Sequence, residues 1–269
     1  DRGWRPRGYE VVVADRAITI RDLLTHTSGI GYGYGVASDR WEEAELQGWY
    51  FAHRHEPVGE TVRRMAGLPF DAHPGDAFVY GYSTDVLGAV IEVVAGVTLD
   101  EFLEARILRP LGMLDTHFYL PEEKHDRLAV VYSLGEAGLT RAPNAGGIDD
   151  MVSQGAYVDG PRRSFSGGAG LLSTAEDYAR FLQMMLNGGE LDGVRILSRK
   201  TVELMTVNHV GDLRGEELEN GGVGFGLGFD VLEDLGERGT PGSVGEFGWG
   251  GAYHSVYWVD PTEQLIVVY

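Results

Sequence analysis

The sequence predicts an α+β protein, in which an antiparallel sheet is covered by helices and joined to a helical lobe. Two observations support this class. In several segments before residue 208, apolar residues recur at the spacing of one helix face and follow capping residues. From residue 225 onward the pattern alternates with period two, which is typical of strands. We therefore expect one domain over residues 1–269, with a site between its two lobes.

The first helices are predicted from caps and apolar spacing. Thr19 and Asp22 form a capping pair ahead of a short helix over residues 20–26, and residues 36–67 are typical of polar helical structure. Residues 78–96 are the centre of the prediction, because a turn with two tyrosines beside a glycine leads there into a core helix that ends at Gly96. The expected buried face of this helix is Val86, Leu87, Val90, Ile91 and Val94.

Further helices follow. Thr98 and Glu101 form a capping box that opens a helix over residues 99–108, and a weaker pattern of short strands and loops covers residues 119–165. Ser173 and Glu176 form the next box, and another helix is expected near residues 199–207. The expected buried face of the helix after Ser173 is Tyr178, Phe181, Leu182, Met185 and Leu186.

The last part of the chain is predicted to form the sheet. The expected strands are 225–231, 245–250, 253–259 and 264–269, with a hairpin turn at Asp260 and Pro261. The chain starts at Asp1 rather than at methionine and stops inside an apolar run. We therefore expect a fragment of a longer protein.

Composition narrows the classes of function. The 269 residues are 43% hydrophobic, which is typical of a folded globular protein. A net charge of -19 repels phosphate backbones and anionic lipids, so we expect no binding to nucleic acid or to a membrane surface. The sequence has no cysteine and no apolar run of membrane-spanning length. Compartment and oligomeric state stay open.

Several common catalytic motifs are missing. The sequence has no Gly-x-Ser-x-Gly nucleophile elbow, no phosphate loop and no dinucleotide fingerprint. His53 and His55 lack a third ligand at useful spacing, so a surface helix is the better interpretation and no metal site is expected. His26, at a helix end, is interpreted as a capping or packing residue.

An ordered set of short motifs carries a family resemblance. The set comprises residues 18–29 (ITIRDLLTHTSG), 82–88 (YSTDVLG), 109–113 (RPLGM), 166–174 (SGGAGLLST), 187–189 (NGG) and 248–252 (GWGGA). In this order they resemble the serine β-lactamase and penicillin-binding-protein-like family, in particular its esterase-type branch. The resemblance covers nearly the whole chain and implies a β-lactamase/transpeptidase-like fold.

The resemblance also implies a two-step acyl transfer without metal or organic cofactor. Such enzymes use a Ser-x-x-Lys nucleophile, a tyrosine base and a Lys-Thr-Gly-like triplet; Tyr82 matches the base. The Ala252 N–H is the expected oxyanion donor, together with the N–H of the nucleophilic serine. Trp249, Gly250 and Gly251 match the triplet and are expected to line the acyl site. The expected pocket walls are Tyr80, Tyr32 and Tyr34.

Three departures from the family pattern affect this prediction. No Ser-x-x-Lys occurs in the 269 residues, so we expect the nucleophile upstream of this fragment. Thr84 stands where the tyrosine motif often has asparagine. Trp249 replaces a lysine that would bind the carboxylate of a β-lactam, which favours a neutral ester or amide as the small-molecule substrate.

Two alternatives stay open. One is a non-catalytic binding or scaffold protein of the same fold, which fits the missing Ser-x-x-Lys equally well. The other is a true β-lactamase or D-Ala-D-Ala peptidase, which Trp249 disfavours. As given, the fragment is expected to be inactive because it lacks the nucleophile.

Overall fold

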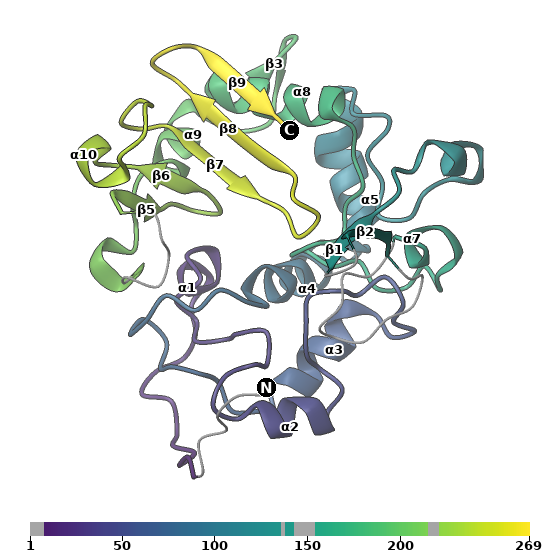
Figure 1. Ribbon diagram of the computed structural model, residues 1–269, viewed down its shortest axis with the longest axis vertical. Coiled ribbons are helices and arrows are strands. Elements are labelled where there is room, and N and C mark those ends of the chain that lie inside the picture. The colour runs from purple at the N-terminus through teal and green to yellow at the C-terminus, as the bar shows by residue number, and fades with distance from the viewer. Residues whose placement is uncertain (1–7, 136–137, 143–153, 215–220) are drawn as a thin grey trace.

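The computed structural model describes residues 8–135, 138–142, 154–214 and 221–269, and it confirms the α+β class (Figure 1). Its main sheet has five antiparallel strands in sequence order. They are β5 (Val223–Phe225), β6 (Asp230–Leu232), β7 (Phe247–Gly250), β8 (Val256–Asp260) and β9 (Leu265–Val268). The helical lobe lies below this sheet in Figure 1.

Two features of the sheet are decided by turns. The single strand predicted over residues 225–231 is wrong, because a tight turn divides it into β5 and β6 and Gly226 N donates to Phe229 O at 2.7 Å. Gly228 in that turn has a φ of +95°, which glycine adopts without strain. The hairpin turn predicted after β8 is confirmed: Asp260 Oδ1 accepts from Thr262 N at 2.9 Å.

The helical lobe contains α1 (Ile20–Leu24), α2 (Ser38–Glu43), α3 (Val58–Met65) and α4 (Ser83–Ala95). Its core is a cluster of buried apolar side chains: Leu23, Ile30, Trp41, Leu46, Phe51, Val58, Met65 and Tyr82. The face predicted for α4 is partly wrong, because Val94 is 82% exposed. The buried positions of this helix are Ser83, Asp85, Gly88 and Ala89, and the small Gly88 and Ala89 permit close packing.

Local capping signals locate the helix ends well. At α1, Thr19 N donates to Asp22 Oδ2 at 2.7 Å, and Thr19 Oγ1 accepts from Asp22 N at 3.2 Å, so the predicted box is confirmed. The box at Thr98 is also confirmed. At the later helix the cap is Thr174 rather than Ser173, because Ser173 Oγ bonds Thr116 Oγ1 at 2.8 Å instead.

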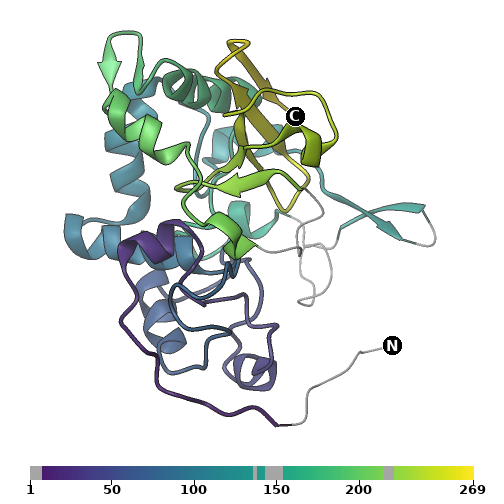
Figure 2. The ribbon, with the colours of Figure 1, turned by 90° about the vertical axis from the view of Figure 1, so that its left-hand side faces the viewer.

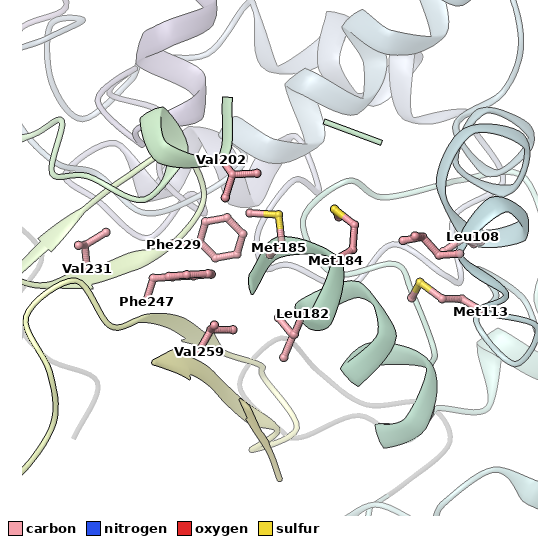
Figure 3. Packing of buried hydrophobic residues seen from close by; sticks show 11 residues of the cluster. Leu108, Met113, Leu182, Met184, Met185, Val202, Phe229, Val231, Phe247 and Val259 are labelled. Atoms are coloured by element: carbon pink, nitrogen blue, oxygen red, sulfur yellow. The ribbon is translucent and has the colours of Figure 1, made fainter. Parts of the chain in front are cut away.

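A second layer of helices supports the sheet. The predicted helix 99–108 is α5 (Leu99–Leu103), which continues through a π-helical turn (Glu104–Leu108) into α6 (Arg109–Leu111). α8 (Ala175–Leu186) packs against the sheet, and Leu182 and Met185 face Val259 and Phe247 in Figure 3. This arrangement confirms the face predicted for α8, where Leu182 and Met185 are fully buried. α9 (Arg199–Met205) adds Val202 to the same core.

The remaining elements are short. The two small hairpins pair β1 (Tyr132–Gly135) with β2 (Gly138–Arg141) and β3 (Glu190–Leu191) with β4 (Val194–Arg195). The helical turns are η2 (Glu122–Arg127), α7 (Ala156–Asp159), η3 (Gly211–Arg214) and α10 (Leu235–Arg238). Of the predicted 119–165 segment, residues 136–137 and 143–153 lie outside the described residues. Among the described helices, none is long and apolar enough to cross a bilayer.

Candidate active site

The two tyrosines on either side of Gly81 point in different directions. Tyr82 is fully buried, whereas Tyr80 keeps 42% of its surface exposed. Gly81 permits this, because a Cβ atom there would lie 2.3 Å from the carbonyl oxygen of Ile30. The two hydroxyls therefore face different surroundings.

Tyr82 occupies a structural position, which argues against the base role expected from the sequence. Its hydroxyl donates to the backbone oxygens of Leu46 at 2.9 Å and Gly48 at 2.5 Å. Its ring stacks on Trp41 with centroids 5.9 Å apart. Burial raises the pKa of Tyr82 above its usual value, and nearby Arg54 lowers it by less. A hydroxyl that is buried and already bonded to backbone carbonyls is poorly placed to take the proton of a catalytic serine, so the structure argues against Tyr82 as the base.

Tyr80, in contrast, has its hydroxyl at the contact between the two lobes. Its Oη accepts a hydrogen bond from Trp249 Nε1 at 3.1 Å, and the two ring centroids are 5.2 Å apart. The bond joins the turn before α4 to the end of β7, across the two lobes. Because Trp249 donates, negative charge on Tyr80 Oη is stabilised by this contact. Tyr32, one of the expected wall residues, lies edge-on to Tyr80 at 5.7 Å.

The segment after Trp249 forms the loop of the β7–β8 hairpin. Gly251 N donates to Ser255 O at 2.8 Å and closes this loop, and a Cβ atom at Gly251 would lie 2.3 Å from Ser255 Oγ. Gly250, Gly251 and Ala252 are all exposed. Within the described part of the chain, the Ala252 N–H donates to no backbone carbonyl. The strand end therefore presents an accessible backbone amide three residues after Trp249.

His26 lies beneath Tyr80. Its ring centroid is 4.6 Å from that of Tyr80 and 5.7 Å from that of Phe225, and the side chain is 2% exposed. Burial lowers the pKa of His26 to about 4, so the imidazole is neutral at pH 7. The interpretation of His26 as a packing residue agrees with these contacts.

Asp85 connects α4 to the glycine-rich segment 166–170. Its Oδ1 accepts from Ser166 Oγ at 2.6 Å and from Gly168 N at 3.2 Å, and the side chain is 1% exposed. Burial raises the pKa of this carboxyl to about 6, while the two hydrogen bonds oppose that shift. Local sequence patterns do not predict this contact, because Asp85 and Ser166 are 81 residues apart.

Arg214, a cation beside the aromatic contacts of the site, is already paired. Arg214 Nη2 lies 2.6 Å from Asp230 Oδ1, and its guanidinium sits over the rings of Phe78 and Phe225 at 5.8 and 5.9 Å. Phe225 in turn contacts Trp249 at 5.2 Å. Among the described residues, no three His, Asp or Glu side chains lie close enough to hold a metal ion. His53 instead stacks on Tyr50 at 5.5 Å.

The expected wall residues differ in their surroundings. Tyr32 lies between Tyr80 and Tyr82, and burial raises its pKa above the usual value. Its loop folds around Asp71, since a Cβ atom at Gly35 would lie 1.8 Å from Asp71 Oδ1. Tyr34, in the same loop, is 52% exposed, and its role as a wall stays a prediction.

The antiparallel sheet backed by α8, the helical lobe and a site between them define a β-lactamase/transpeptidase-like fold. Comparison with known proteins agrees: residues 10–269 match the β-lactamase family. The chain belongs to that family. The resemblance inferred from the ordered motifs is therefore confirmed, as is the fold class.

Named relatives show which branch the chain resembles. It is 34% identical to the esterase EstB of Burkholderia gladioli over 265 residues, which cover 93% of this chain and 64% of EstB. A protein of Mycobacterium tuberculosis is 35% identical over 99% of this chain and 68% of its own length. Among solved structures, EstCE1, a hydrolase with promiscuous acyltransferase activity, matches with a TM-score of 0.80 and 31% identity over 93% of this chain and 66% of its own. The chain thus spans about two thirds of these relatives.

Proposed function

We propose that the complete gene product is a serine hydrolase that forms an acyl-enzyme on neutral ester or amide substrates. The observation that carries this proposal is the contact between Tyr80 and Trp249, which places a tyrosine hydroxyl beside the exposed strand end with the Ala252 amide. The similarity to EstB and EstCE1 supports an ester as the substrate class.

In this mechanism Tyr80, rather than Tyr82, is the general base. Tyr80 Oη takes the proton of the serine hydroxyl while the serine oxygen bonds to the carbonyl carbon of the ester. The C–O bond to the alcohol then breaks, and the alcohol leaves with the proton held by Tyr80. Water repeats the sequence on the acyl-enzyme and releases the acid and the free serine.

The oxyanion that forms in each step needs donors. The Ala252 N–H is our proposed donor from this chain, with the N–H of the nucleophilic serine as its partner. Gly250 and Gly251 have no side chain, which lets the carbonyl approach the strand end closely. We place the nucleophile upstream of Asp1, since these residues contain no Ser-x-x-Lys.

Charge supports a neutral substrate. Trp249 contributes an indole N–H and an aromatic ring at the position of the triplet's first residue, and Arg214 is paired with Asp230. Trp249, unlike a lysine at this position, gives a carboxylate substrate no cationic partner. This argument favours esters over β-lactams and over peptides with a terminal carboxylate.

A second candidate is a binding protein of the same fold without catalysis. The absence of Ser-x-x-Lys from these residues fits this candidate if the complete gene product also lacks the motif. In that case the Tyr80–Trp249 contact would hold a ligand or the two lobes together, without proton transfer.

The test uses the complete gene product, a fluorophosphonate probe and a p-nitrophenyl ester with a short acyl chain. We expect labelling of one serine and ester hydrolysis by the wild type. Tyr80→Phe should lower hydrolysis by about 10²–10⁴-fold, the usual contribution of general base catalysis. A folded wild-type protein that neither labels nor hydrolyses the ester would support the binding protein instead.

A further inference from the structure

A second aromatic contact joins the lobes on the other side of the exposed amide. Tyr253, at the tip of the β7–β8 hairpin, lies edge-on to Trp49 of the helical lobe, with ring centroids 5.3 Å apart at 87°. Trp49 also contacts Tyr50 edge-on at 5.6 Å. Figure 1 shows the β7–β8 hairpin reaching down toward the helical lobe, where this contact forms. We call Trp49 and Tyr253 the distal pair.

The distal pair and the Tyr80–Trp249 contact flank the same short segment. Trp249 precedes Gly250–Ala252 and Tyr253 follows it, so the exposed backbone between them has an aromatic side chain at each end. Consecutive Cα atoms are about 3.8 Å apart. The Ala252 N–H and the Tyr253 side chain therefore belong to neighbouring residues of the same exposed loop.

The rings of the distal pair are accessible and apolar. Trp49 and Tyr253 are both partly exposed, unlike the buried rings of Tyr82 and Phe225. In the described part of the chain, no arginine or lysine lies over Trp49, Tyr80 or Trp249. Aromatic rings prefer edge-to-face or offset partners, and such partners add to the gain from burial. A ligand ring can make the same kind of contact with the exposed parts of Trp49 and Tyr253.

We infer that the distal pair selects esters that carry an aryl group. With the ester carbonyl at the Ala252 amide, the aryl ring packs against Trp49 and Tyr253, and the other half of the ester faces Tyr80 and Trp249. This inference rests on the proposed acyl transfer at the same site and adds its substrate class. It assigns Trp49 and Tyr253 a role in specificity that the motif comparison does not include.

The test compares each variant with the wild type on the same substrates, so differences in intrinsic ester reactivity cancel. The substrates are ethyl benzoate and phenyl acetate, with the aryl group in the acyl or the alcohol half, against ethyl butyrate. For Tyr253→Ala we expect the ratio of aryl to alkyl kcat/KM to fall about tenfold for one of the two aryl esters. The ester that responds shows which half faces the distal pair.

Controls separate specificity from folding and from loss of catalysis. Trp49→Leu should lower the same ratio, and the double variant should lower it less than the product of the two, because the rings act as a pair. Phe102→Ala, a partly exposed aromatic on α5 beneath Arg106, should leave the ratio unchanged. Thermal unfolding of each variant checks that it folds.

The inference and the proposed function fail in different ways. If Tyr80→Phe abolishes turnover but Tyr253→Ala and Trp49→Leu leave the aryl to alkyl ratio unchanged, the aryl specificity is wrong and the acyl transfer stands. If the wild type hydrolyses no ester, the distal pair is tested directly by measuring how benzamide and isobutyramide bind, with ligand-observed NMR. Benzamide binding that Tyr253→Ala weakens supports the inference, and equal binding of both amides overturns it.

Discussion

Tyr80 and Tyr82 are separated by one glycine, yet one exposes 42% of its surface beside Trp249 and the other is completely buried against Trp41. Both hydroxyls have hydrogen-bond partners, but Tyr80 Oη accepts from an indole and Tyr82 Oη donates to two carbonyls. Substitution by phenylalanine should therefore lower activity at Tyr80 and lower stability at Tyr82.

For Tyr82→Phe we expect a loss of about 1–3 kcal/mol in the free energy of unfolding, because the carbonyls of Leu46 and Gly48 lose the hydroxyl donor that they share. Its turnover of small esters should stay far above that of Tyr80→Phe, which should lose about 10²–10⁴-fold in hydrolysis but be as stable as the wild type. Urea denaturation and ester hydrolysis on the complete gene product measure both quantities. Inactivity of Tyr82→Phe with full stability would restore Tyr82 as the base.

Trp249→Phe keeps an aromatic ring but removes the donor to Tyr80 Oη. If that donor stabilises charge in the reaction, kcat/KM should fall about tenfold. Trp258→Phe is the matched control, since Trp258 pairs with Gly248 and so lies on the opposite face of the hairpin from Trp249. Equal losses in the two variants would mean that the indole acts through packing rather than through its N–H.

His26→Phe tests the neutral imidazole beneath Tyr80. The pKa of His26 is about 4 in the fold and near 6.5 in an unfolded chain, so its contribution to stability is present above pH 6.5 and is lost as the pH falls toward 4. As the pH falls from 6.5 to 4, the free energy of unfolding of His26→Phe should therefore decrease by up to about 3 kcal/mol less than that of the wild type. Unfolding free energies at pH 7, 5.5 and 4.5 would show it.

A parallel pH profile of His26→Phe and wild type would contradict the burial of the imidazole. Loss at still lower pH is a separate effect, because Arg16 bonds Asp22 and holds the pKa of that carboxyl below its usual value. Stability from Asp22 is present above its unfolded pKa and is lost only as the pH falls through the lower folded value.

Asp85→Asn should change the pH dependence in the opposite direction. The Asp85 carboxyl has a pKa of about 6, raised from 3.8, so its contribution to stability is fully present below pH 3.8 and is lost as the pH rises through 6. The stability of Asp85→Asn relative to wild type should therefore rise between pH 4 and 7, by up to about 3 kcal/mol. A difference that is the same at both pH values would show that Asp85 ionises normally.

The features that could be predicted from the sequence are those set by residues close together in the chain. Caps at Thr19 and Thr98 act within one helical turn, so short-range patterns predict them. Residues 225–231 are divided into β5 and β6 by a turn, and the glycines of that turn are also compatible with an irregular single strand. The exposure of Val94 depends on which segments pack over the end of α4, and apolar spacing alone does not contain that information.

The site could be predicted from local sequence even less completely than the fold. Either tyrosine beside Gly81 could satisfy the pattern of a base before a core helix, and local sequence does not distinguish them. Contacts with distant residues decide: Leu46 lies 36 positions from Tyr82, and Trp249 lies 169 positions from Tyr80. The match of Trp249, Gly250 and Gly251 to the triplet came from the family resemblance, and the aromatic partners of Trp249 could not be predicted from it.

The hydroxyl of Tyr82 holds the oxygen of Gly48, and the next residue is Trp49. The buried Tyr82 thereby helps to position the loop whose Trp49 contacts Tyr253. Mutational libraries aimed at new substrates should therefore find productive changes at Tyr82 and its loop as well as at the exposed rings. Such changes would trade thermal tolerance against substrate range, because the same hydrogen bond contributes to both.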